Sequence, residues 1–156
     1  MQLVGALALR YLLSRQHPAR LKMAYWLLKT EPQEYSYKDL EQQGRAVWNG
    51  VKNPLALKYL RTMQPQDEAL IYHTGKERAV VGIAQILTQP YPDPALDEPK
   101  LVVVDIQAMR SLTSPVTLAQ IKQSKNFKDF DLIRLPRLSV VPVADQYWQQ
   151  ILQLES

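Results

Sequence analysis

The stretch AVWNGVKNP, residues 46–54, carries the clearest structural signal in the chain. Asparagine is a favoured helix N-cap and proline is preorganised for the first helical position, so Asn53 and Pro54 predict a helix that begins here and runs to about residue 63. The apolar residues before Asn53 predict a strand or an extended segment, and Gly50 permits another group to approach the backbone closely. Trp48 therefore lies where a strand passes into a helix, either as part of the core or as the wall of a pocket.

Apolar runs of strand length alternate with short helical segments on both sides of this stretch. The expected strands span residues 25–29, 46–51, 68–74, 79–87, 101–109 and 137–143. The expected helices span residues 36–44, 53–63, 115–124 and 144–154, with a hairpin turn at 75–78 and an irregular proline-rich loop at 89–99. Because the strands follow no βαβ rhythm, the pattern predicts an α+β fold, a small mixed barrel of five to six strands with short flanking helices.

Two of these helices carry their own start signals. Ser36, with Asp39 three positions later, resembles a capping box. Ser114 or Thr117 starts the helix expected at residues 115–124.

The net charge of +4 is concentrated at the N-terminus, because residues 1–22 contain four basic and no acidic side chains and the remaining residues are balanced. Any nucleic-acid binding by the balanced part must depend on a local patch. We interpret residues 1–22 as an N-terminal extension, either poorly ordered or upstream of a natural start at Met23, and residues 23–156 as one domain. The alternative is an amphipathic targeting or membrane-surface element, whereas the short apolar run is unlike a secretory signal or a transmembrane span.

Composition argues against several kinds of chemistry. The chain contains no cysteine, which excludes disulfides and thiolate sites and is compatible with a cytoplasmic location. With two histidines far apart in sequence, we expect neither a metal nor a cofactor. The five glycines are scattered singly, so no phosphate-binding loop is present. A hydrolase that uses His73 with Ser139 or a carboxylate such as Glu31 stays open as an alternative without a motif.

Polar and aromatic side chains gather at the ends of the expected strands. Four segments share this character: KTEP at residues 29–32, WNGVKN at 48–53, YHT at 72–74 and RLSV at 137–140. Strand ends of a small barrel converge, and stacking faces with hydrogen-bonding groups are what a flipped-out base requires. The alternative for Trp48 is a place in the core, which we also expect for Trp26 and Trp148. The alternatives for the others are a structural role for His73, solvation of Lys29 and Lys52, and helix capping alone for Asn53.

With these segments assembled, the chain resembles the EVE domain family. The matching pattern is WLLKTEP, VWNGVKNPLALKYLRTM, DEALIYHT, VVGIAQI, VVVDIQ, PVTLAQIK and RLSVVPV, in this order from residue 23 to residue 154. The resemblance implies a PUA-like fold, related to the YTH and ASCH domains, and binding of a modified nucleobase, with modified cytosine such as 5-methylcytosine in DNA as the expected ligand and modified RNA as another.

The resemblance also implies a set of nucleic-acid-binding residues. They are Lys29, Glu31, Ser36, Trp48, Val51, Lys52, Asn53, Tyr72, His73, Thr74, Arg137 and Ser139. Two positions depart from the family pattern. Lys52 stands where arginine is common and lacks its bidentate fork, and Thr74 stands where serine is common and narrows the pocket with a methyl group.

We therefore expect a non-enzymatic reader of a modified base that acts as a monomer with a nucleic-acid partner and no membrane partner. The other hypotheses are the small hydrolase or nuclease using His73, and an interaction module for small molecules or proteins. A phosphate-binding surface would distinguish the reader from the interaction module, because its affinity would fall with salt concentration.

Overall fold

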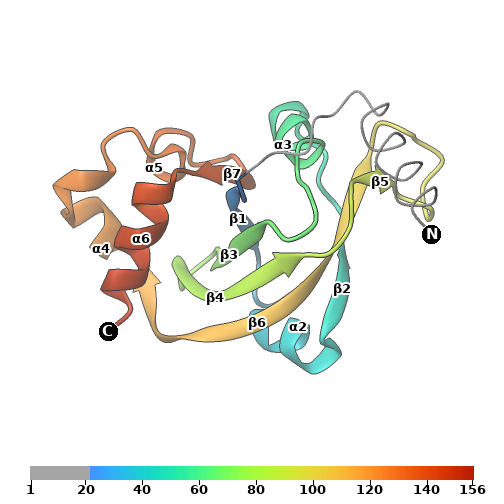
Figure 1. Cartoon of the computed structure of the whole chain (residues 1–156). Helices are drawn as coiled ribbons and strands as arrows, with labels where there is room; N and C mark the ends of the chain where they lie inside the picture. The colour runs from blue at the N-terminus through green and yellow to red at the C-terminus, as the bar shows by residue number, and fades with distance from the viewer. Residues whose placement is uncertain (1–21) are drawn as a thin grey trace, which may run out of the picture.

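The computed structural model describes residues 22–156, which form a curved mixed sheet with short helices around it (Figure 1). The strands are β1 (Tyr25–Thr30), β2 (Arg45–Trp48), β3 (Glu68–His73), β4 (Ala79–Ile86), β5 (Tyr91–Pro92), β6 (Val102–Thr117) and β7 (Val140–Val143). The helices are α2 (Tyr37–Gln43), α3 (Pro54–Leu60), α4 (Leu118–Gln123), α5 (Asp131–Arg134) and α6 (Asp145–Leu154), with a 3₁₀ turn, η1, at Lys125–Phe127. The α+β class predicted from the sequence is confirmed.

The strand order is β2-β6-β4-β3-β1-β7, and β5 pairs with β6 beside this path. β1 and β3 are parallel, with Leu27 opposite Leu70, and the other neighbours are antiparallel. The long β6 sweeps beneath the molecule from α4 and α6 at one end to β2 at the other (Figure 1). Because β2 and β7 are the two ends of the strand order, the barrel stays open between them.

The observed elements differ from the sequence expectation in several places. β2 ends at Trp48 rather than residue 51, and α3 ends at Leu60 rather than about residue 63. Residues 22–156 contain seven strands rather than five to six, and the additional strand, β5, lies within the loop expected to be irregular. β6 continues to Thr117 through residues expected to be helical, because β4 pairs with it as far as Thr117 and the capping box of Thr117 and Gln120 starts α4 only there. β7 begins at Val140 instead of residue 137, and α5 and η1 were not expected.

The local helix signals are confirmed. The Asn53 side chain accepts a hydrogen bond from the Ala56 backbone N–H at 3.0 Å, with Pro54 as the first residue of α3. Ser36 and Asp39 form a reciprocal capping box at the start of α2. These caps satisfy backbone donors that the helices leave free at their N-termini, so both junctions are anchored.

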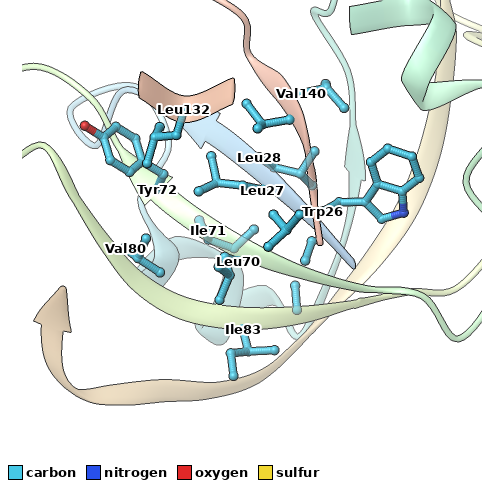
Figure 2. Close-up of a cluster of buried hydrophobic side chains, with 14 of the residues drawn as sticks. Trp26, Leu27, Leu28, Leu70, Ile71, Tyr72, Val80, Ile83, Leu132 and Val140 are labelled. Atoms are coloured by element: carbon cyan, nitrogen blue, oxygen red, sulfur yellow. The ribbon is translucent and has the colours of Figure 1, made fainter. Parts of the chain in front are cut away.

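The core is built from the strands of the sheet together with the inward faces of the helices, and Figure 2 shows part of it, contributed by β1, β3, β4, β7 and α5. Trp26 is buried as expected, and its indole N–H donates to the buried Asp67 carboxylate at 3.0 Å. Trp148 is also buried, and its ring stacks on Tyr25 at 4.2 Å between centroids. Both tryptophans therefore belong to the core, as the sequence predicted, and neither lines the cavity described below.

The predicted N-terminal extension lies outside the described residues except for Lys22, which forms an ion pair with Asp145 at the start of α6. None of the helices within residues 22–156 has the length and apolar character needed to cross a membrane.

Candidate nucleic-acid-binding site

A cavity of about 610 Å³ opens at the gap between β2 and the β1–β7 pair, where the barrel does not close. We call this gap the open seam of the barrel. The end of β1, the loop before α2, the last residues of β2 and the segment that leads into α3 all reach it. The lining residues are Lys29, Thr30, Glu31, Glu34, Tyr35, Gln43, Ala46, Val47, Trp48, Asn49, Gly50, Val51 and Ser139. The cavity thus combines an aromatic and aliphatic wall with carboxylate, amide, hydroxyl and ammonium groups.

Trp48 belongs both to the core and to this cavity. Only 7% of its surface is exposed, and its ring meets that of Tyr35 edge-on at 6.3 Å between centroids. An edge-to-face pair of this kind holds both rings in place. The two alternatives raised by the sequence are therefore not exclusive, because a largely buried ring presents its remaining surface to the cavity.

Tyr35 and Gln43 form a fixed polar pair in the cavity wall. The Tyr35 hydroxyl donates to Gln43 Oε1 at 2.6 Å, which leaves the Gln43 amide nitrogen as a donor. Burial, with a further contribution from Asp39, raises the pKa of Tyr35, so the phenol keeps its proton at neutral pH.

Lys29 connects the cavity to the segment before β7. Its ammonium group donates to the Pro136 carbonyl at 2.8 Å and lies 5.8 Å from the centre of the Tyr72 ring. Burial lowers the pKa of Lys29. The side chain is therefore held in one direction rather than solvated, contrary to the simplest expectation for a surface lysine.

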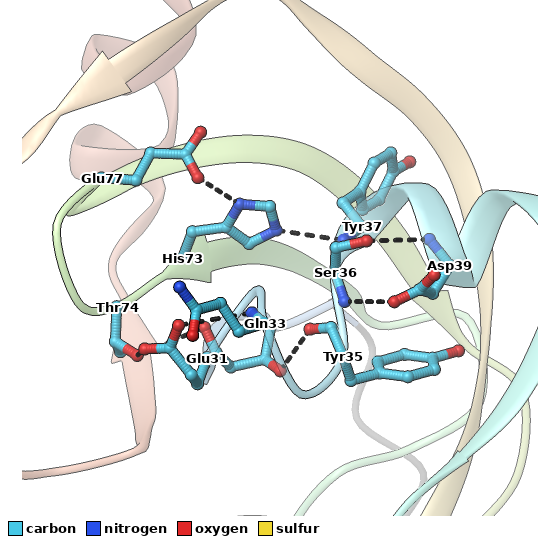
Figure 3. A network of polar contacts seen from close by, with 10 residues as sticks. Glu31, Gln33, Tyr35, Ser36, Tyr37, Asp39, His73, Thr74 and Glu77 are labelled. Atoms are coloured by element: carbon cyan, nitrogen blue, oxygen red, sulfur yellow. Dashed lines mark hydrogen bonds and ion pairs between the residues drawn. The ribbon is translucent and has the colours of Figure 1, made fainter.

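Glu31 is held at the ends of β1 and β3. Its carboxylate accepts from the Gln33 backbone N–H and from the Thr74 hydroxyl, each at 3.3 Å (Figure 3). It also packs on Gly75, where an added Cβ would lie 2.7 Å from Glu31 Oε2. Thr74 therefore positions a residue of the cavity wall without lining the cavity itself.

His73 and Ser36 lie next to this wall but serve the fold (Figure 3). His73 is buried, its Nε2 accepts from the Tyr37 backbone N–H at 3.0 Å, and its Nδ1 lies 2.5 Å from Glu77 Oε2. Since Nε2 accepts, the proton must be on Nδ1 and is donated to Glu77. The basic lone pair of His73 is therefore occupied, and the Ser36 hydroxyl is likewise occupied by the Asp39 backbone N–H.

The structure divides the residues expected from the sequence into three groups. Those that line the cavity are Lys29, Glu31, Trp48, Val51 and Ser139. Asn53 and Arg137 line a neighbouring groove, and Lys52 is exposed between the two. Ser36, Tyr72, His73 and Thr74 line neither. Participation of the expected residues in ligand binding stays a prediction.

Sequence reasoning missed several residues of the wall, chiefly Glu34, Tyr35, Gln43, Val47 and Asn49. Asn49 lies within the segment WNGVKN itself, and Tyr35 lies three residues after KTEP, so the aromatic and polar character of these two side chains was a usable signal. Gln43 gave no such signal, because it reaches the cavity only through the way α2 packs beside β2.

Among residues 22–156, no cluster of three or more histidine, aspartate or glutamate side chains is placed to hold a metal ion.

Comparison with known proteins identifies the family to which this chain belongs. The model of the EVE domain family matches residues 24–154. Thymocyte nuclear protein 1 of Mus musculus is 31% identical over 84% of this chain and 73% of its own length.

Solved structures show the same architecture. The structure of Rpa0253 from Rhodopseudomonas palustris is 37% identical, with a TM-score of 0.81 over 85% of this chain and 93% of that one. The human protein THYN1, solved in complex with DNA containing 5-methylcytosine, is 29% identical, with a TM-score of 0.79 over 85% of this chain and 98% of that one. These matches confirm the PUA-like fold implied by the sequence resemblance.

Proposed function

Because the chain belongs to the EVE domain family, we propose that it binds DNA by taking one modified cytosine into the cavity at the open seam of the barrel, without catalysing a reaction. The observation that carries the proposal is the position of Trp48 and the polar groups around it in that cavity. The human relative THYN1, solved with DNA that contains 5-methylcytosine, supports the choice of ligand.

The size and surface of the cavity fit this ligand class. Its volume of about 610 Å³ lies within the range of small-molecule sites and accommodates one base with its methyl group. Trp48 and Val47 offer apolar surface for the base and the methyl group, since aromatic side chains grip splayed-out bases by stacking.

The polar groups suit the edge of cytosine. Carboxylates accept hydrogen bonds from the exocyclic amine of cytosine, and Glu31 and Glu34 are the carboxylates of the wall. Amide and ammonium donors, which Gln43, Asn49 and Lys29 carry, suit the ring nitrogen and carbonyl oxygen. Thymine lacks the amine, so a pocket with two carboxylates disfavours it.

A hydrolytic role for His73 is less well supported. General base catalysis needs a free lone pair within reach of the group that loses its proton. The Nε2 lone pair of His73 accepts from the Tyr37 backbone, and Nδ1 faces Glu77. Binding without turnover is therefore the simpler function of this arrangement.

The test is the affinity of the Trp48→Leu variant for oligonucleotides labelled for fluorescence anisotropy. Replacing the ring by an aliphatic side chain keeps apolar volume but removes a stacking surface of about 1–3 kcal/mol, so affinity for 5-methylcytosine DNA should fall about 10- to 100-fold. Circular dichroism and the melting temperature establish that the variant is folded.

The matched control is Tyr59→Leu, which changes an aromatic side chain that packs near Trp26 and lies outside the cavity wall. This variant should bind as the unaltered protein does. The oligonucleotide panel contains cytosine, 5-methylcytosine, 5-hydroxymethylcytosine and N6-methyladenine in DNA, and 5-methylcytosine in RNA. Equal affinity for all members, or no effect of a folded Trp48→Leu variant, would show that the cavity does not select a modified base.

A further inference from the structure

A second hollow adjoins the cavity on the side of α3 and the segment before β7. It is a groove of about 420 Å³ lined by Asn53, Leu55, Arg134, Leu135, Pro136, Arg137 and Leu138. Leu55 and Leu135 are each 37% exposed, which places them among the few large hydrophobic side chains that face solvent in the described part of the chain. Large exposed apolar side chains beside a binding pocket indicate a surface that is covered when a partner binds.

The groove and the cavity share one wall. The Lys29 ammonium group, which lines the cavity, donates to the carbonyl of Pro136, which lines the groove. Leu138 of the groove precedes Ser139 of the cavity, and the Ser139 carbonyl accepts from the Lys29 backbone N–H at 3.0 Å. A ligand that fills the cavity and extends past Lys29 therefore reaches the groove directly.

The two hollows differ in charge. Glu31 and Glu34 in the cavity wall outnumber Lys29, so the cavity is unsuited to a phosphodiester. Among the described residues that line the groove, by contrast, the charged side chains are two arginines, Arg134 and Arg137.

These two arginines differ in whether their guanidinium groups already form an ion pair within the described residues. Arg134 is partly neutralised by Asp131 at 3.2 Å. Arg137 is exposed and forms no ion pair within residues 22–156. A polyanion whose base enters the cavity thus finds two arginines along the adjoining groove, and one of them is unpaired within the described residues.

We propose that this groove binds the double-stranded DNA that flanks the flipped nucleotide. In this arrangement Leu55 and Leu135 cover the base surface that flipping leaves unstacked, and Arg137 contacts a flanking phosphate. Extruding a base exposes the apolar faces of its neighbours, and proteins that distort DNA cover such faces with leucine and similar side chains. The inference rests on the proposed function, and it adds that the duplex is the preferred form of the ligand.

The experiment compares a duplex containing one 5-methylcytosine with the single strand of the same sequence, using the full chain and its Leu55→Ala and Leu135→Ala variants. A single strand needs no stacked neighbours to be covered, so only the duplex should depend on the leucines. We expect each variant to bind the duplex about tenfold more weakly than the unaltered chain, which is the scale for one buried aliphatic contact. Its affinity for the single strand should stay within about twofold of the unaltered chain.

Leu96→Ala is the matched control, because Leu96 is 45% exposed and lies outside both hollows. The slope of log affinity against log salt concentration is negative, and Arg137→Gln should reduce its magnitude on the duplex by about 1. Lys100→Gln should leave the slope unchanged.

The outcomes separate the inference from the function on which it rests. If the unaltered protein binds neither form of the 5-methylcytosine oligonucleotide, the proposed function fails and this inference with it. If it binds both forms and the leucine variants lose affinity for neither, the groove assignment is wrong while the cavity assignment stands. Self-association that the leucine variants abolish, with duplex affinity unchanged, would assign the groove to a second copy of the chain and overturn the proposal.

Discussion

His73 is a potentially catalytic side chain whose hydrogen-bonding groups are both used to stabilise the fold. Its imidazole accepts the backbone N–H of Tyr37, the first residue of α2, and faces the Glu77 carboxylate across the β3–β4 turn. The same ring therefore holds the start of a helix and a hairpin turn in place. A histidine in this position affects the cavity only indirectly, through α2, whose last residue, Gln43, reaches the wall.

The His73→Ala variant should be less stable by about 1–3 kcal/mol, because a buried backbone N–H loses its acceptor. Urea denaturation gives the free energy of unfolding. His73→Gln is the matched variant, since its side-chain oxygen can replace Nε2 as the acceptor, and it should recover part of the loss. A His73→Ala protein of unaltered stability would contradict the structural role.

The C-terminal helix α6 is tied to the far end of β6 by one carboxylate. The Glu155 carboxylate accepts a hydrogen bond from each terminal nitrogen of the Arg110 guanidinium group at 2.8 Å. It also accepts one from the Thr113 backbone N–H at 2.9 Å. The Glu155 backbone carbonyl also accepts from the Ser114 hydroxyl at 2.6 Å. The second half of β6 therefore supplies the partners that hold the chain end.

Stability should depend on pH through this carboxylate. The hydrogen bonds from Arg110 above all lower the pKa of Glu155 from its ordinary value of 4.5 to about 2. Because the pKa is depressed in the folded state, the stabilisation is complete above about pH 4.5 and is lost as the pH falls towards 2.

The Glu155→Gln variant should therefore show a smaller loss of stability between pH 5 and pH 2 than the unaltered chain. At neutral pH it should be less stable by about 1–3 kcal/mol, since charge-assisted hydrogen bonds are lost. Thermal unfolding across this pH range measures both effects, with Glu98→Gln in the exposed loop before β6 as the control. Identical pH profiles for Glu155→Gln and the unaltered chain would contradict this assignment.

At the scale of the whole molecule, two surfaces of different charge lie side by side at the open seam of the barrel. The acidic, aromatic cavity is suited to a base, and the exposed cations Lys52, Arg134 and Arg137 lie beside it. The fold is not a general polycation, so affinity for nucleic acid should come from few phosphate contacts and from the base itself.

Salt dependence measures this balance. With two or three phosphate contacts, the slope of log affinity against log salt concentration on duplex DNA should lie between about −2 and −3. Anisotropy titrations of a 5-methylcytosine duplex at several salt concentrations give the slope. A value near zero would favour the interaction module for small molecules or proteins, and a value near −6 would indicate binding dominated by the backbone.

Much of the fold follows from short-range patterns. Asn53-Pro54 and the Ser36–Asp39 box mark the starts of α3 and α2 because capping depends on residues within one helical turn. The β3–β4 hairpin and the α6 helix were likewise expected from local periodicity. The motif order from residue 23 to residue 154 was sufficient to identify the EVE family, since it is carried by residue types and spacing alone.

Short stretches of sequence do not show which distant side chains come into contact in the folded protein. The parallel pairing of β1 with β3 joins residues about 43 positions apart, and the open seam exists only because β2 and β7 are at opposite ends of the sheet. Gln43 enters the cavity wall through helix packing, while His73 and Ser36, equally polar in sequence, are occupied by backbone groups of α2. Short-range signals depend on near neighbours along the chain, whereas a pocket depends on strand register and packing between distant segments. The amino-acid sequence alone thus establishes the family, the helix starts and Trp48 as a candidate wall, and the three-dimensional packing decides which residues line the cavity.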